Sequence, residues 1–211
     1  MTPLPAPVEH NPCSRPLLRA GLALLMAVSA CSTPAPVAEY DLGMLVPPSP
    51  ALRLPAAVVA IQVQAPSWLD DGALHYRLAY ADGAQLRQYA GSRWVAAPAR
   101  LLEQRLRSAL AQGTGASAER PPAGAARRLQ LRVELSEFTQ VFDTPAQSHA
   151  LVQAMATLTD PHGTAVIARQ GFTVQRVAAQ ADATGAVASL RGAAEALLEQ
   201  IAAWLAAQPP G

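Results

Sequence analysis

Cysteine is nearly absent from this chain, which has two in 211 residues, Cys13 and Cys31. No cysteine follows Cys31, so disulfides and cysteine zinc clusters are excluded from the rest of the chain. Charge is also scarce, at 15% of residues with a net charge of +1. Without a basic stripe to neutralise phosphates, nucleic acid is not an expected partner. The hydrophobic fraction of 51% and the chain length instead predict one domain held together by packing.

Side chains suited to catalysis or metal binding are few and scattered. The four histidines have no metal-ligand spacing between them, and they are His10, His75, His149 and His162. Ser136, His149 and Asp160 lie in no recognisable hydrolase motif. We therefore expect no catalytic residue, no metal site and no cofactor, and a protein that is not an enzyme.

The N-terminal hydrophobic run is too short to cross a membrane. Arg15 and Arg19 precede an apolar run over 20–30, roughly half of the 20 residues that a spanning helix needs. Positive charge followed by a short apolar stretch is typical of a secretory signal. The next residues, "VSAC", resemble the lipobox of bacterial lipoproteins, where the cysteine receives diacylglycerol. We expect residues 1–30 to be a lipoprotein signal peptide and Cys31 to become the lipidated N-terminus.

Two alternatives leave Cys31 without lipid: a disulfide to Cys13, or an ordinary signal cleaved nearby. Lipidation is favoured because the lipobox residues agree, and because Cys13 would be discarded with the signal and could not pair. Two or three acyl chains on one cysteine would then hold the protein firmly on a membrane. Ser32 stands where an aspartate would favour the inner membrane in lipoproteins of this kind. The expected location is the outer membrane, facing the periplasm.

A proline-rich segment follows the cysteine. Six prolines lie in it, Pro34, Pro36, Pro47, Pro48, Pro50 and Pro55, and they favour extended backbone. Residues 31–57 are therefore predicted to be a lipidated tether that reaches at most about 80 Å at about 3.1 Å per residue. Within it, "YDLG" at 40–43 fits either a short edge strand or plain linker.

Two series of strands, each closed by a helix, are predicted over 58–211. The first has strands at 58–63, 74–80 and 85–89, with Asp82-Gly83 as a hairpin turn, and a helix from Pro98 to Gly113. The second has strands at 129–142, 148–158 and 164–174, the last with a break at Gly171, and a helix around 187–205 capped by Asp182 or Thr184. Asp160 to Gly163 fits a type I turn. The fold class is α+β: an antiparallel sheet packed with two main helices, in two strand-strand-strand-helix units.

Four stretches resemble a known family in their order along the chain: "APSWLDDGALHYR", "YAGSRWVAAPARLLEQRLRSAL", "LRVELSEFTQVF" and "LLEQIAAWL". They are similar to PqiC-like members of the ABC-type transport auxiliary lipoprotein family, over about 40–205. The most specific part is Arg93-Trp94 followed by a proline and a leucine-rich helix. The sequence departs from the family at Asp71, where a basic residue is more usual.

The resemblance implies an auxiliary component of an ABC/MCE-type system that moves lipid or another apolar solute between membranes. It implies association with an MCE-domain protein or with further copies of the chain as a homo-oligomer, and no chemistry of its own. The alternative is a structural or assembly lipoprotein of the outer membrane without a solute path. Three aromatic residues, Trp94, Tyr76 and Tyr80, are candidates for either an interface or the core.

Overall fold

The folded unit is an open mixed sheet with helices on one side. The computed structural model describes residues 36–43, 58–113 and 128–208, and those from Val37 onward belong to one compact unit. The strands are β1 (Ala38–Tyr40), β2 (Val58–Gln64), β3 (Ala73–Leu78), β4 (Gly83–Trp94), β5 (Leu129–Thr144), β6 (Gln147–Thr159) and β7 (Val166–Val177). The helices are η2 (Ser67–Leu69, a 3₁₀ turn), α2 (Ala79–Asp82), α3 (Pro98–Gly113) and α4 (Ala183–Ala206).

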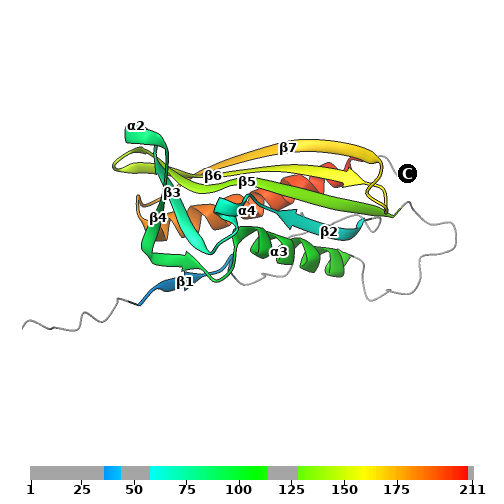
Figure 1. Ribbon diagram of the computed structural model, residues 1–211, viewed down its shortest axis with the longest axis horizontal. Helices are drawn as coiled ribbons and strands as arrows, with labels where there is room; N and C mark the ends of the chain where they lie inside the picture. The colour runs from blue at the N-terminus through cyan, green and yellow to red at the C-terminus, as the bar shows by residue number, and fades with distance from the viewer. Residues whose placement is uncertain (1–35, 44–57, 114–127, 209–211) are drawn as a thin grey trace, which may run out of the picture. The chain divides into compact units, whose positions relative to one another are not determined.

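Strand β5 joins the two halves of the sheet, whose order is β1-β4-β3-β5-β6-β7 (Figure 1). One edge of β5 pairs antiparallel with β6, which pairs antiparallel with β7. The other edge is shared by two parallel strands: β2 lies along the first part of β5, up to Gln64 opposite Glu134, and β3 lies along the last part, from Tyr76 opposite Gln140. Strand β5, the first strand of the second predicted unit, therefore pairs with strands of both predicted units.

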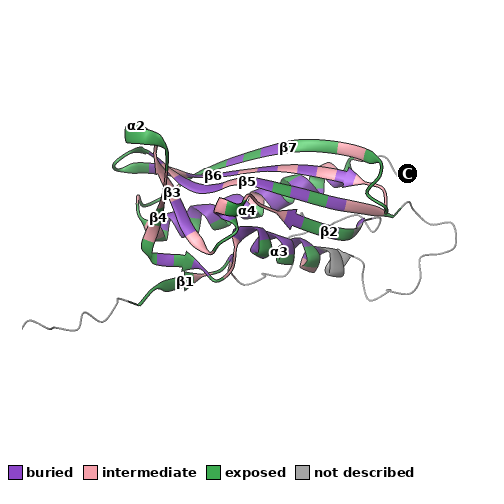
Figure 2. Cartoon of the chain, in the orientation of Figure 1, coloured by how far each residue is buried: buried purple, intermediate pink, exposed green. Residues whose placement is uncertain are grey.

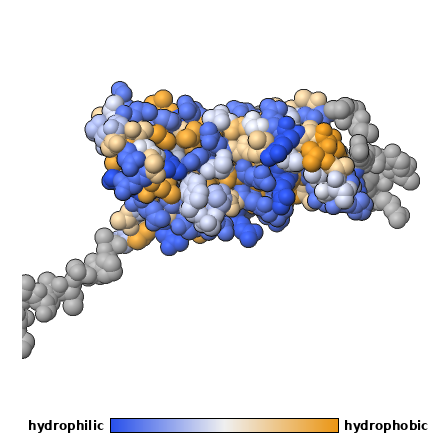
Figure 3. All heavy atoms as spheres, turned by 45° about the horizontal axis from the view of Figure 1, so that its top comes forward, coloured by the Kyte–Doolittle hydropathy of each residue, from blue (hydrophilic) through white to orange (hydrophobic). Residues whose placement is uncertain are grey.

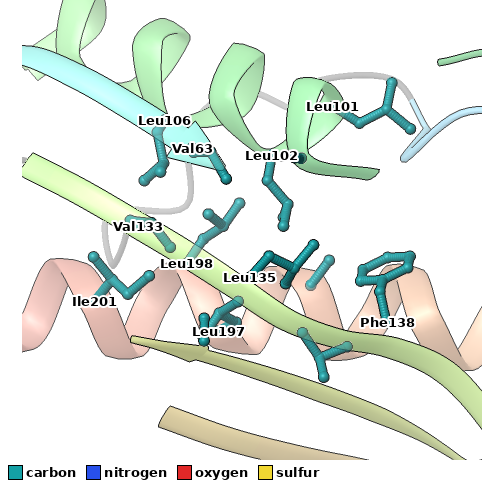
Figure 4. Close-up of a cluster of buried hydrophobic side chains, with 14 of the residues drawn as sticks. Val63, Leu101, Leu102, Leu106, Val133, Leu135, Phe138, Leu197, Leu198 and Ile201 are labelled. Carbon is teal, nitrogen blue, oxygen red and sulfur yellow. The ribbon is translucent and has the colours of Figure 1, made fainter. Parts of the chain in front are cut away.

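Alternation along the strands directs one face of the sheet toward the helices. In β5, Leu131, Val133 and Leu135 are buried while Arg132 and Glu134 are exposed, and Figure 2 shows the same alternation of buried and less buried residues along β6. Inward side chains of β2 and β5 share one core with both long helices. In Figure 4, leucines of α3 and α4 meet β5 in this cluster, whose labelled members are Val63, Leu101, Leu102, Leu106, Val133, Leu135, Phe138, Leu197, Leu198 and Ile201.

The predicted α+β class, with two main helices and two strand-strand-strand-helix units, is confirmed. The β3–β4 hairpin has the predicted location. The Gly163 N–H donates to the Asp160 carbonyl at 3.1 Å, in the predicted turn. Asp182 caps α4, because its Oδ1 accepts the Gly185 N–H at 2.8 Å.

Four details differ from the sequence-based expectations. The sheet is mixed, because β1–β4, β2–β5 and β3–β5 are parallel pairs; pairings between distant strands leave no mark on local periodicity. Tyr80 lies in α2 and not on a strand. Strand β7 runs through Gly171, which pairs with Met155. Finally, β1 belongs to the sheet, so part of the segment that was expected to be tether is folded.

Candidate functional site

Strand β1 connects the N-terminal segment to the sheet. Its residues pair in parallel with β4, from Ala38 opposite Ser92 to Tyr40 opposite Trp94. The Val95 N–H then donates to the Tyr40 carbonyl at 2.8 Å. Val37, the first residue of the folded unit, follows Cys31 by six positions (37 − 31). The candidate lipidation site is therefore close in sequence to a strand of the sheet.

Residues 41–43 hold β1 against the helices. Leu42 is buried in the core, and the Gly43 N–H donates to Asp41 Oδ1 at 2.6 Å. Arg105 of α3 donates to the Gly43 carbonyl, and the guanidinium of Arg191 from α4 fills the space where a β-carbon on Gly43 would lie. Gly43 has φ +86°, in the region that favours glycine. We call these residues, Asp41, Leu42, Gly43, Arg105 and Arg191, the β1 clasp.

A polar groove of about 580 Å³ runs between β2 and α3. Glu103 lines this groove; its side chain is buried, accepts the Val63 N–H at 2.9 Å and forms an ion pair with Arg107 at 2.8 Å. Arg100, Asp70 and Gln62 also line the groove. Glu103 thereby satisfies a backbone donor of β2 that faces away from β5, and the groove offers polar groups to whatever enters it.

A second cluster surrounds a buried histidine on β3. His75 is 1% exposed, and its Nδ1 has no hydrogen-bond partner among the described residues. The rings of Trp68 and His75 meet edge to face at 5.9 Å between centroids. The guanidinium of Arg77 lies over the Trp68 ring, and its Nη2 donates to Glu137 Oε1 at 3.1 Å. Burial lowers the pKa of His75, more than the nearby Asp71 raises it. The imidazole is held in its neutral form.

A short chain of hydrogen bonds connects β4, β5 and β6. The Tyr89 hydroxyl donates to Gln140 Oε1 at 2.6 Å, and Gln140 Nε2 donates to the Ser148 hydroxyl oxygen at 2.8 Å. Burial, with smaller contributions from Tyr76 and Asp182, raises the pKa of Tyr89 to about 12, so the phenol stays protonated. The side chains of Tyr89, Gln140 and Ser148 thus satisfy one another, and we interpret these hydrogen bonds as fixing the three strands relative to one another.

The three aromatic candidates lie in different environments and do not form one site. Trp94 is 0% exposed and packs against Phe138 at 5.6 Å between ring centroids, inside the core. Tyr76 is half-buried and its ring lies 4.7 Å from that of Tyr89. Tyr80 is 48% exposed on α2. The fourth candidate, Cys31, lies outside the described residues.

The residues considered for catalysis also stay apart. Ser136 donates to the Gln153 carbonyl at 3.3 Å, His149 pairs with Asp143 at 2.8 Å, and Asp160 holds its own turn through Thr164. The described part of the chain contains no group of three or more acidic, histidine or cysteine side chains arranged to hold a metal ion. Among the same residues, no helix is long and apolar enough to cross a membrane.

Sequence reasoning missed His75, Glu103 and the β1 clasp. Alternation along β3 placed His75 on the polar side, and nothing local indicates that Trp68 covers it. Glu103 lies in α3, where the helical spacing of apolar residues predicts the core. That spacing does not indicate that a charged residue of the helix contacts β2, 40 residues away. The available signal for the clasp is "YDLG", since aspartate can accept a hydrogen bond from the backbone two residues on and glycine tolerates positive φ.

Comparisons with known proteins agree with this architecture. A family model described as "ABC-type transport auxiliary lipoprotein component" matches residues 40–202. The crystal structure of a Xanthomonas campestris protein assigned to the family model DUF330 has a TM-score of 0.59 and 19% identity, covering 79% of this chain and 93% of that one. The crystal structure of an uncharacterized protein has a TM-score of 0.57 and 16% identity, covering 81% and 99%. Both likenesses show a shared fold. None of the curated proteins matches the chain.

Proposed function

Because the chain belongs to the ABC-type transport auxiliary lipoprotein family, we propose that it is a lipid-anchored protein of the bacterial envelope. In this proposal Cys31 carries the acyl chains, and the folded unit faces the periplasm from the outer membrane. The observation that carries the proposal is the order of two features: a lipobox-like "VSAC" ending at Cys31, and a family match that begins at residue 40.

The proposed activity is auxiliary and not catalytic. The protein would dock with an MCE-domain protein of an ABC transport system and support the passage of phospholipid, or another apolar solute, between membranes. The groove between β2 and α3 is lined by Asp70, Arg100, Glu103 and Arg107, and such polar walls suit contact with a protein better than storage of an acyl chain. In this proposal the solute path belongs to the assembly and not to a chamber in this chain.

Lipidation is tested by replacing each cysteine separately with serine. In cells given labelled palmitate, we expect the wild-type chain and Cys13→Ser to incorporate label, because Cys13 lies in the predicted signal. Cys31→Ser should incorporate none and should leave the membrane fraction, while its folded unit keeps the same thermal midpoint. Equal labelling of Cys31→Ser and wild type would contradict the proposal.

Docking is tested with the intact lipoprotein. We expect a tagged copy, expressed with the MCE-domain protein of the same cell, to recover that protein and phospholipid in a detergent-free membrane extract. If neither is recovered while palmitate is still incorporated, the structural or assembly role without a solute path is supported instead.

A further inference from the structure

The position of β1 shortens the connection between the lipid and the sheet. A tether running from residue 31 to 57 would let the folded unit move far from the membrane. Because β1 pairs with β4 and residue 42 is buried, only six steps along the chain separate Cys31 from Val37, the first residue of the folded unit. At a maximum of about 3.6 Å per residue, that chain reaches about 22 Å.

This reach is less than half the length of the sheet. Strand β5 has 16 residues, and at about 3.3 Å per residue it is about 50 Å long. With so short a connection to the membrane anchor, the two ends of the sheet cannot lie equally close to the bilayer on average. The end at which β1 enters is therefore held near the bilayer.

Register and Figure 1 identify that end. The pairing of β4 with β3 shifts register between Gln88 and Arg93, where β4 turns a corner, and β1 pairs with Ser92 to Trp94 at the end of β4. Figure 1 places β1 and this corner at the end that carries α2 and the β5–β6 turn. The β6–β7 turn, with His162, lies at the opposite end, because Gln130, Thr159 and Val166 are paired there.

Three of the exposed large hydrophobic residues of the described chain lie at the β1 end: Val37, Tyr80 and Val177, exposed by 48%, 48% and 83%. Tyr80 follows Leu78, which pairs with Phe142 near the β5–β6 turn, and Val177 pairs with His149 just beyond that turn. Apolar side chains and tyrosine suit the boundary between headgroups and acyl chains. The broad open face of β5 and β7 instead carries opposite charges such as Glu134 and Arg169, and hydrophilic residues prevail over the side of the molecule seen in Figure 3.

We propose that the end of the sheet formed by β1, the β4 corner, α2 and the β5–β6 turn rests on the lipid headgroups, while the β6–β7 turn points away into the periplasm. This inference depends on the lipidation of Cys31 proposed above. Acidic and basic side chains are mixed at this end, with Glu39 beside Arg93, so short reach and apolar contact, and not a basic patch, hold it there.

The test uses the full chain, matured in cells and placed on vesicles of phosphatidylethanolamine and phosphatidylglycerol. Lipidation occupies Cys31 and maturation removes Cys13, so one engineered cysteine is the only free thiol. Gly91→Cys marks the β4 corner, where an added β-carbon meets nothing within 4 Å, and His162→Cys marks the exposed far turn. Each thiol carries a bimane fluorophore, and a lipid with a nitroxide on its headgroup is the quencher.

We expect quenching to be several-fold stronger at position 91 than at position 162. Inserting a Gly-Ser segment of about 20 residues between Thr33 and Pro34, which adds about 25 Å of average reach, should remove most of that difference. Equal quenching at the two positions, stronger quenching at position 162, or a difference unchanged by the insertion would overturn the inference.

The mass of the mature N-terminus separates the two proposals in the same samples. Acylated protein with equal quenching overturns only the orientation. Protein without acyl chains on Cys31 overturns the lipidation on which the orientation depends.

Discussion

His75 is a buried imidazole whose protonation opposes folding. Its pKa is lowered in the folded protein, mainly by burial, whereas the unfolded chain has the ordinary value of about 6.5. Below about pH 6.5 the unfolded state therefore binds more protons than the folded state, and stability decreases as the pH falls. The free energy of unfolding depends on the protonation of His75 between the ordinary pKa and the lowered one, and the stability is lost as the pH falls through this window.

This predicts a specific change on replacing His75 with glutamine. Between pH 7 and pH 5, we expect the free energy of unfolding to fall less in His75→Gln than in wild type, as measured by urea denaturation at several pH values. His162→Gln is the matched control, because it removes an imidazole that is exposed in the β6–β7 turn. Identical pH profiles for wild type and His75→Gln would show that the buried ring takes no part.

Glu103 stabilises β2 from the side that β5 does not cover. Its loss in Glu103→Ala leaves the Val63 N–H without its acceptor, and we expect a cost of about 1–3 kcal/mol in the free energy of unfolding. Glu103→Gln should cost less, because an amide oxygen can still accept that hydrogen bond. Glu195→Ala, at an exposed position of α4, is the control and should change stability by no more than about 0.5 kcal/mol. Equal midpoints for Glu103→Ala and Glu195→Ala in chemical denaturation would refute this role.

The β1 clasp makes a strand of three residues part of the fold. Gly43→Ala places a side chain at φ +86° and against the Arg191 guanidinium, so we expect a cost of about 1–3 kcal/mol and faster hydrogen exchange at the Val95 amide. Gly91→Ala is the matched control in the neighbouring strand, because its added carbon meets no atom within 4 Å. Should Gly43→Ala unfold and exchange like Gly91→Ala, the clasp would have no role in holding β1.

Among the elements, those with a strong local pattern were predictable from the sequence. The stripe containing Leu197 and Ile201 predicted α4, the alternation from Leu129 to Leu135 predicted β5, and the Asp160 turn was identified by its aspartate, proline and glycine. Pairing between β5 and the earlier strands was not predictable, because residues far apart in sequence decide it. Local sequence leaves "YDLG" at 40–43 open between strand and linker and does not indicate β1 at Ala38–Tyr40, because three residues are too few to show a period.

The candidate site was predictable only in part, for the same reason. Cys31 is identified by residues directly before it, so local sequence was sufficient to propose it. Glu103 and His75 acquire their roles from Val63 and Trp68, which lie on other elements. Tyr80 was expected on a strand face because the alternation continues to it, but the chain turns into α2 after Leu78.

At the scale of the whole molecule, the folded unit begins before the proline-rich segment ends. A chain that starts at Val37 keeps β1 and the clasp, and we expect its free energy of unfolding to equal that of the mature protein. A chain that starts at residue 44 loses the buried Leu42 and should be less stable by about 2 kcal/mol or more. Urea denaturation of the two truncated chains measures the difference, and equal midpoints would place the start of the folded unit after residue 43.

The shared edge of β5 has a consequence for a protein that leaves the cytoplasm N-terminus first, as the proposed signal requires. Strands β2 and β3 cross the membrane before β5, their parallel partner, is available, and long-range pairings of this kind form slowly. The β5–β6–β7 meander arrives later but closes through short turns. The half that emerges last should therefore assemble first and provide the template on which the earlier half condenses, so the newly exported chain needs protection from aggregation until its C-terminal half has crossed.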